Sequence, residues 1–140
     1  MAIKDIVKDV AILKTKSTNK FYPEVHAFVE KNLIDTAKAH QDNCLGLAAI
    51  QIGEAVRVFV IKVGDKFLSF RNPMILWRSK EVYSAKEGCL SLEGTRNVTR
   101  NETIKVMYEG GDGKNYMRVL SGLVGEVFQH EYDHLNGVLI

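Results

Sequence analysis

Two histidines, His130 and His134, constrain the fold of this chain more than any other feature of the sequence. Residues four apart lie on one face of a helix, so both imidazoles can reach a single metal ion. Glu131 lies between them and can approach a water molecule on that ion, the arrangement found in metal hydrolases. The alternative is an exposed helix with two solvated histidines, but this spacing around a glutamate rarely arises by chance. The motif therefore predicts a metal-binding helix.

A third protein ligand has to come from upstream of the motif. Residues 135–140 offer no ligating side chain, whereas catalytic sites usually have three protein ligands and one open position. The upstream candidates are several carboxylates and the side chains of His26, His40, Cys44 and Cys89.

Cys89 is the best of these candidates because of its setting, Glu87-Gly88-Cys89-Leu90-Ser91. Gly88 permits an unusual backbone angle or a close approach, and a thiolate is a strong ligand for iron or zinc. The alternative is a buried structural cysteine, and without its neighbours in the sequence Cys89 would be interpreted in that way.

The pattern of apolar residues and turns predicts two helices with strands between them. A helix is expected from about Phe21 to His40, with Pro23 in its first turn and Val25, Phe28, Val29 and Leu33 at helical spacing. A second helix is expected over residues 121–135, ended by Gly137. Asn72-Pro73 should interrupt regular structure, and strands are expected at 56–61, 66–70, 81–85, 103–108 and 116–120. This order predicts an α+β fold with antiparallel sheets packed around the motif helix and an N-terminal helix.

Size and composition exclude several classes of protein. The chain has 140 residues, 46% hydrophobic and 26% charged, which fits one domain over 1–140. The net charge of +2 comes from scattered residues and does not indicate a nucleic-acid surface. Two cysteines do not make a disulfide scaffold, and neither a signal peptide nor a membrane-spanning run is evident. A cytoplasmic protein is expected; the sequence leaves its oligomeric state open.

Three segments in order resemble the signature motifs of the peptide deformylase family. They are residues 44–51, 87–91 and 129–135, and the second and third match fully. Cys44 stands where the family usually has glycine, and Glu93 lies near the place of a family proline. The chain thus looks like a short form of the family that lacks the usual extension after the motif helix.

The resemblance implies a hydrolase that removes the formyl group from N-formylmethionyl peptides of nascent chains, near the ribosome. It implies Fe(II) as the native metal, replaceable by nickel, cobalt or zinc. It further assigns Cys89, His130 and His134 as ligands, Glu131 as acid–base, the Gln51 amide and the Leu90 N–H as donors to the reacting carbonyl, and Leu45, Gly46, Glu87 and Arg96 to substrate binding.

Two hypotheses of another kind stay open on the residues alone. One is a general zinc peptidase, which the missing downstream ligand and the cysteine motif disfavour. The other is a binding protein that has kept the fold and lost catalysis. Glu87 is also expected to pair with Arg100, and Asp133 to orient an imidazole or an arginine near the metal.

Overall fold

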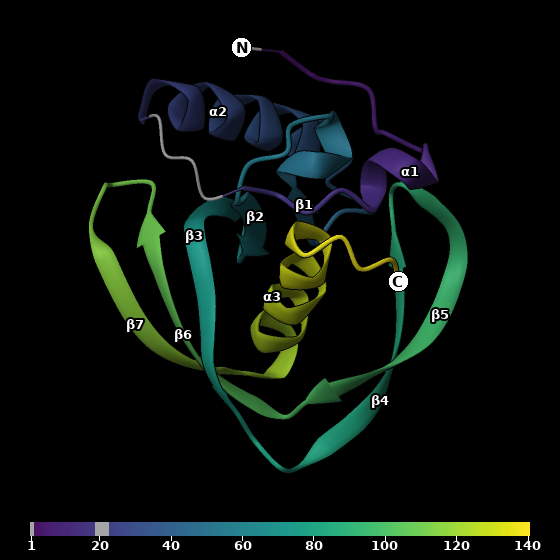
Figure 1. Ribbon diagram of the computed structural model, residues 1–140, viewed down its shortest axis with the longest axis vertical. Helices are drawn as coiled ribbons and strands as arrows, with labels where there is room; N and C mark the ends of the chain where they lie inside the picture. The colour runs from purple at the N-terminus through teal and green to yellow at the C-terminus, as the bar shows by residue number, and fades with distance from the viewer. Residues whose placement is uncertain (1, 19–22) are drawn as a thin grey trace.

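The computed structural model describes residues 2–18 and 23–140 (Figure 1). The expected α+β fold class is confirmed. In chain order the elements are α1 (Val10–Leu13), α2 (Pro23–Ala39), β1 (Gly46–Ala48), the 3₁₀ helix η1 (Ala49–Ile52), β2 (Val58–Val63), β3 (Lys66–Arg78), β4 (Val82–Cys89), β5 (Leu92–Asn101), β6 (Thr103–Gly110), β7 (Asn115–Ser121) and α3 (Gly122–Leu135).

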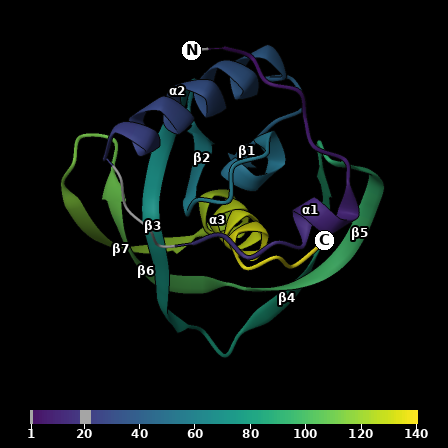
Figure 2. The same ribbon diagram turned by 45° about the horizontal axis from the view of Figure 1, so that its top comes forward.

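Five of the strands form one antiparallel sheet in the order β1-β2-β3-β6-β7, and β4 and β5 form a separate hairpin. In both views the motif helix α3 lies in the middle of the molecule, with strands around it (Figures 1 and 2). The helix α2 lies across the other side of β1 and β2. The motif helix α3 is thus held between the large sheet and the β4-β5 hairpin.

Strand β2 is buried on both faces because a helix covers each side of it. Val58 and Val60 pack in a cluster with Val29 and Leu33 of α2. Phe59 and the alternate residue Ile61 pack in a second cluster with α3. This two-sided burial explains why residues 58–61 are all apolar rather than alternating with polar ones.

The expected interruption at Asn72-Pro73 is wrong, because β3 runs through it to Arg78. The strand accommodates the pair by a bulge: its register against β6 shifts between Arg71 and Met74, and Asn72 has a φ of 46°. Proline is tolerated at a bulge, since the missing N–H is not needed there for the ladder.

The helix over 121–135 is present with its start at Gly122, and α2 ends at Ala39 rather than His40. The predicted start of α2 at Phe21 lies outside the described residues. The predicted apolar stripe of α2 is partly wrong, because Val25 and Phe28 are exposed. Its buried stripe contains His26 and, at helical spacing, Val29, Leu33 and Ala37.

The N-terminal segment packs against the end of α3. The Ser17 N–H donates to the Leu135 carbonyl at 2.9 Å, and Arg57 donates to the same carbonyl at 3.2 Å. Gly137 follows the helix with a φ of 73°, and a Cβ built on it would lie 2.3 Å from the Lys14 carbonyl oxygen. The turn after α3 therefore requires glycine for two reasons, backbone angle and space.

We expect Gly137→Ala to lower the free energy of unfolding by about 2–4 kcal/mol, the sum of left-handed strain and the clash with Lys14. Gly113→Ala is the matched control: its φ is 79°, and a Cβ there has no heavy atom of the described residues within 4 Å. That control should cost only about 1 kcal/mol. Urea unfolding followed by circular dichroism measures both, and equal losses would mean that the Lys14 contact carries no cost.

Candidate active site

Three potential metal donors converge from α3 and the β4-β5 hairpin. His130 and His134 lie on the inner face of α3, with their Nε2 atoms 3.2 Å apart. Cys89 ends β4, and one ligand atom from each of these three residues lies within 4.8 Å of the others. Both imidazoles are buried and Cys89 is partly exposed, so the group opens to solvent from the cysteine side.

The hairpin turn holds Cys89 in place and favours its thiolate. The ladder shifts register between Glu87 and Cys89, and a Cβ on Gly88 would lie 3.1 Å from the Gly94 carbonyl oxygen. Burial alone would raise the pKa of Cys89, but the bond to His130 and the backbone N–H groups of Leu92 and Ser91 lower it. A depressed thiol pKa supplies the form of cysteine that binds metal.

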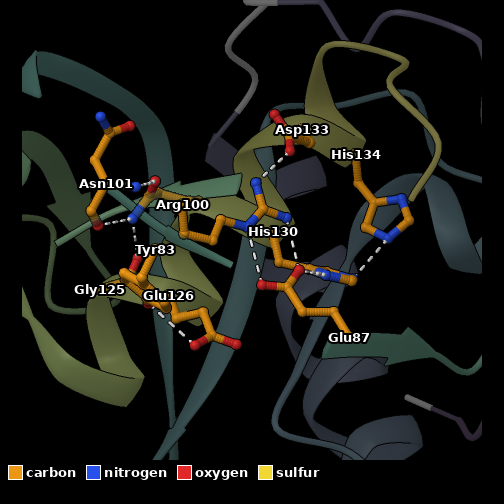
Figure 3. A network of polar contacts seen from close by, with 10 residues as sticks. Tyr83, Glu87, Arg100, Asn101, Gly125, Glu126, His130, Asp133 and His134 are labelled. Carbon is orange, nitrogen blue, oxygen red and sulfur yellow. Dashed lines mark hydrogen bonds and ion pairs between the residues drawn. The ribbon is translucent and has the colours of Figure 1, made fainter. Parts of the chain in front are cut away.

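A buried ion network connects the hairpin to α3 (Figure 3). The Arg100 guanidinium donates to both Glu87 oxygens at 2.9 and 2.7 Å and to Asp133 at 2.6 Å. Glu87 Oε1 in turn contacts His130 Nδ1 at 2.8 Å. The expected pair of Glu87 with Arg100 is therefore present, and of the two kinds of partner considered for Asp133 the structure has an arginine, Arg100.

The network fixes the orientation and charge of its members. Burial would raise the pKa of Glu87, but Arg100 and His130 lower it to about 2. The ionised Glu87 holds His130 by Nδ1 and so leaves Nε2 directed at His134, as a carboxylate commonly does for a metal-binding histidine. Burial would lower the pKa of His130, yet its bonds to Cys89 and Glu87 raise it to about 10.

Glu131 lies in the opposite kind of environment. It is buried, and burial raises its pKa to about 7 against the lowering effect of His130. Its Oε1 has no hydrogen-bond partner among the described residues. A Cβ on Gly46 would lie 2.7 Å from Glu131 Oε2, so glycine at that position lets β1 approach the carboxylate. A carboxyl group of this kind can exchange a proton near neutral pH.

Gln51 is held rigidly beside the hairpin turn. Its Oε1 accepts from the Ala48 N–H at 3.0 Å, and its Nε2 donates to Ser91 Oγ at 3.2 Å. A primary amide carries two N–H groups, so one remains for another acceptor. Ser91 as the partner of Gln51 was not anticipated from the sequence, because nothing in either motif indicates that the two meet.

A cavity opens beside these groups. The residues lining it include most of those expected at the site: Leu45, Gly46, Glu87, Cys89, Leu90, His130 and Glu131. Gln51, Arg96 and His134 are not among its described lining residues; Arg96 is exposed and donates to the Glu93 carbonyl. Glu126 lines the cavity and accepts from Tyr83, and sequence reasoning missed it. The signal was available, since Glu126 precedes His130 by one helical turn.

The donor set fits a divalent metal. One thiolate and two imidazoles are typical ligands of iron and zinc. Burial and the charge on His130 lower the pKa of His134 to about 3, which leaves that ring neutral and able to ligate. His130 is held at Nδ1 by Glu87 and would release the proton on Nε2 on binding a metal ion. Cys44 suits the role less well: its Sγ donates to the Gly46 carbonyl, and burial raises its pKa to about 12.

Comparison with known proteins identifies the family. The family model for polypeptide deformylase matches residues 3–140. The chain belongs to this family. A peptide deformylase of Clostridium beijerinckii is 39% identical over 138 residues, which cover 99% of each chain. One of Thermotoga petrophila is 41% identical over 128 residues, covering 91% of this chain and 76% of that relative.

Solved deformylase structures have the same fold. The crystal structure of the Thermotoga maritima enzyme has a TM-score of 0.85 at 36% identity and covers 99% of this chain and 95% of that one. A structure from Acinetobacter baumannii, described as bound to Met-Ala-Ser, has a TM-score of 0.88 at 28% identity and covers 99% and 97%. The chain is thus a metal-dependent hydrolase that removes the formyl group from nascent peptides.

We expect Arg100→Met to destabilise the protein by about 3–5 kcal/mol, because it leaves the buried Glu87 without its main partner. Arg118→Met is the control, since that arginine is exposed on β7 and stacks on Tyr116. Chemical unfolding compares the two variants. A loss in Arg100→Met no larger than in the control would show that Glu87 is compensated by other groups.

Proposed function

We propose that Cys89, His130 and His134 bind one divalent metal ion for deformylation and that Glu131 transfers the protons. The observation that carries the proposal is the buried Glu131 carboxyl, whose Oε1 has no partner among the described residues, next to three converging donors. The relative bound to Met-Ala-Ser supports a peptide that begins with methionine as the ligand of this cavity.

A metal ion held by these residues would lower the pKa of bound water and polarise the substrate carbonyl. We propose Fe(II) as the native ion, with nickel, cobalt or zinc as replacements, because a thiolate and two imidazoles suit all of them. Metal analysis of anaerobically purified protein tests this identity.

The residues around the proposed metal donors transfer the protons and stabilise the charge on the formyl oxygen. Glu131 accepts the proton of the attacking water and passes it to the departing amine, and a pKa of about 7 suits both directions. The free N–H of Gln51 and the backbone N–H of Leu90 donate to the formyl oxygen as it gains negative charge. Such a donor typically lowers the barrier by about 3 kcal/mol. Ala48 and Ser91 hold the Gln51 amide in one orientation.

The methionine side chain of the substrate is proposed to lie against Leu45 and Gly46, which line the cavity. Glu87 lines it as well, but its carboxylate is already engaged by Arg100 and His130. Arg96 is then left for contacts with the peptide beyond the cavity. We further propose that the enzyme works in the cytoplasm on chains leaving the ribosome; within the described residues no helix is long and apolar enough to cross a membrane.

Glu131→Ala should keep its metal and lose about 100- to 10,000-fold in kcat/KM on a formyl-methionyl peptide, the usual contribution of a proton-transfer group. Metal content and turnover are measured on the same preparation, with an unformylated peptide as the second substrate. Normal turnover in the variant would remove Glu131 from the mechanism. Cleavage of the unformylated peptide by the unaltered protein would instead favour a general peptidase.

Cys89→Ala should lose metal to a chelator quickly and abolish turnover, whereas Cys44→Ala should keep stoichiometric metal and most of its activity. The first variant leaves two imidazoles and water, and the second removes a protonated thiol bonded to a backbone carbonyl. Both variants are dialysed identically before metal and activity are assayed. The reverse pattern, with metal kept by Cys89→Ala and lost by Cys44→Ala, would show that the ligand assignment is wrong.

A further inference from the structure

The strands β3, β6 and β7 turn one face toward α3 and the opposite face away from it. On β6, Ile104 and Val106 pack in the cluster that contains Phe128 of α3. Successive residues of a strand point to opposite faces, so Lys105, Met107 and Glu109 point away from α3. We call this second side of the three strands the outer face.

The ladder arranges the outer face in three rows, because residues directly opposite in antiparallel strands share a face. The central row consists of three methionines, Met74, Met107 and Met117. The row on one side holds Trp77, Lys105 and Val119, and the row on the other side holds Arg71, Glu109 and Asn115.

The middle of this face is apolar and exposed. Met74 and Met117 are each 50% exposed, Trp77 is 53% and Val119 is 67% exposed. Among the described residues, no element covers these side chains from outside. Exposed apolar patches of this kind commonly mark interaction sites. Within the described chain, none of them lines the active-site cavity.

We propose that the outer face binds a second copy of this chain in a symmetric dimer whose two-fold axis runs along the methionine row. Charge complementarity favours this arrangement. Lys105 and Glu109 lie two residues to either side of Met107 on the same strand and the same face. When two such faces meet with their β6 strands antiparallel, Lys105 of each copy lies opposite Glu109 of the other, and methionine lies on methionine.

The same two-fold axis matches the flanking rows. Trp77 is brought opposite Arg71 of the second copy, whose guanidinium is largely buried and already paired with Glu30 and Glu109, so this contact contributes packing rather than a new charge pair. Val119 is brought opposite the uncharged Asn115. The other face-to-face arrangement, with the axis along the strands, sets Lys105 against Lys105 and Glu109 against Glu109, and like-charge contacts of this kind cost several kcal/mol. The pattern therefore selects one symmetric arrangement, as an isologous interface requires.

The test is sedimentation velocity on the metal-loaded protein from low to several hundred micromolar concentration. The unaltered protein should pass from monomer to dimer over this range. Trp77 is the only tryptophan, so its emission should shift to the blue in parallel. Lys105→Glu and Glu109→Lys should each weaken the dimer about tenfold or more, because each variant alone opposes like charges.

An equimolar mixture of the two variants supplies the decisive measurement. In the mixed pair the two introduced side chains, of opposite charge, face each other, and the unaltered Lys105 of one copy faces the unaltered Glu109 of the other. Association should therefore return toward that of the unaltered protein. Lys38→Glu is the matched control, an equal charge change on the exposed side of α2, and should leave the dimer intact. Turnover and circular dichroism confirm that each variant is folded, since the outer face is separate from the catalytic groups.

Glu109 also pairs with Arg71, so Met107→Lys serves as a second variant should Glu109→Lys fail to fold. It places two ammonium groups at the centre of the interface and should likewise abolish the dimer. A monomer at every concentration overturns the proposal, as does a mixture that associates no better than the single variants. A monomer whose Trp77 emission shifts only on adding anionic phospholipid vesicles also overturns it, in favour of a membrane-facing surface.

Discussion

The candidate site depends on the Arg100 guanidinium, because it joins the two parts of the chain that carry the proposed metal donors. It lies 5% exposed between Glu87 of the hairpin and Asp133 of α3. Removing a charge from water is costly, and the cost is recovered only when every charged atom has a partner. Here the arginine donates to two carboxylates, and one of them, Glu87, also holds His130 by its Nδ1. The position of the hairpin against α3, the orientation of the His130 ring and the direction of its Nε2 therefore all depend on the buried Arg100.

The same few residues give two glutamates opposite properties. Glu87 is held ionised by Arg100 and His130, whereas burial keeps the pKa of Glu131 near 7. A pair of carboxyl groups whose environments separate their pKa values can divide positioning from proton transfer. Gly46 contributes to this division, because any side chain there would displace the Glu131 carboxyl from β1.

Much of this arrangement was predictable from local patterns, and the rest depended on contacts between distant segments. The helix over 121–135 followed from the spacing of its histidines, and the grouping of Cys89 with them followed from the family motifs; the role of each residue stays a prediction. Strand β5 was missed because residues 92–101 are mostly polar and exposed, which removes the alternation that identifies a strand. The Gln51–Ser91 bond and the bulge at Asn72 depend on chain segments that meet only after folding.

The position of α3 has a consequence for how the protein is made. Every strand precedes this helix in the chain, yet Ala48, Phe59, Phe70 and Val106 all bury their side chains against the cluster that α3 completes. During vectorial synthesis the sheet therefore emerges with one apolar face uncovered, and the hairpin emerges with Glu87 and Arg100 lacking their contacts to the helix. The native core and the proposed metal donors come together only once α3 has left the ribosome tunnel, so every strand has to be made before the fold can be completed.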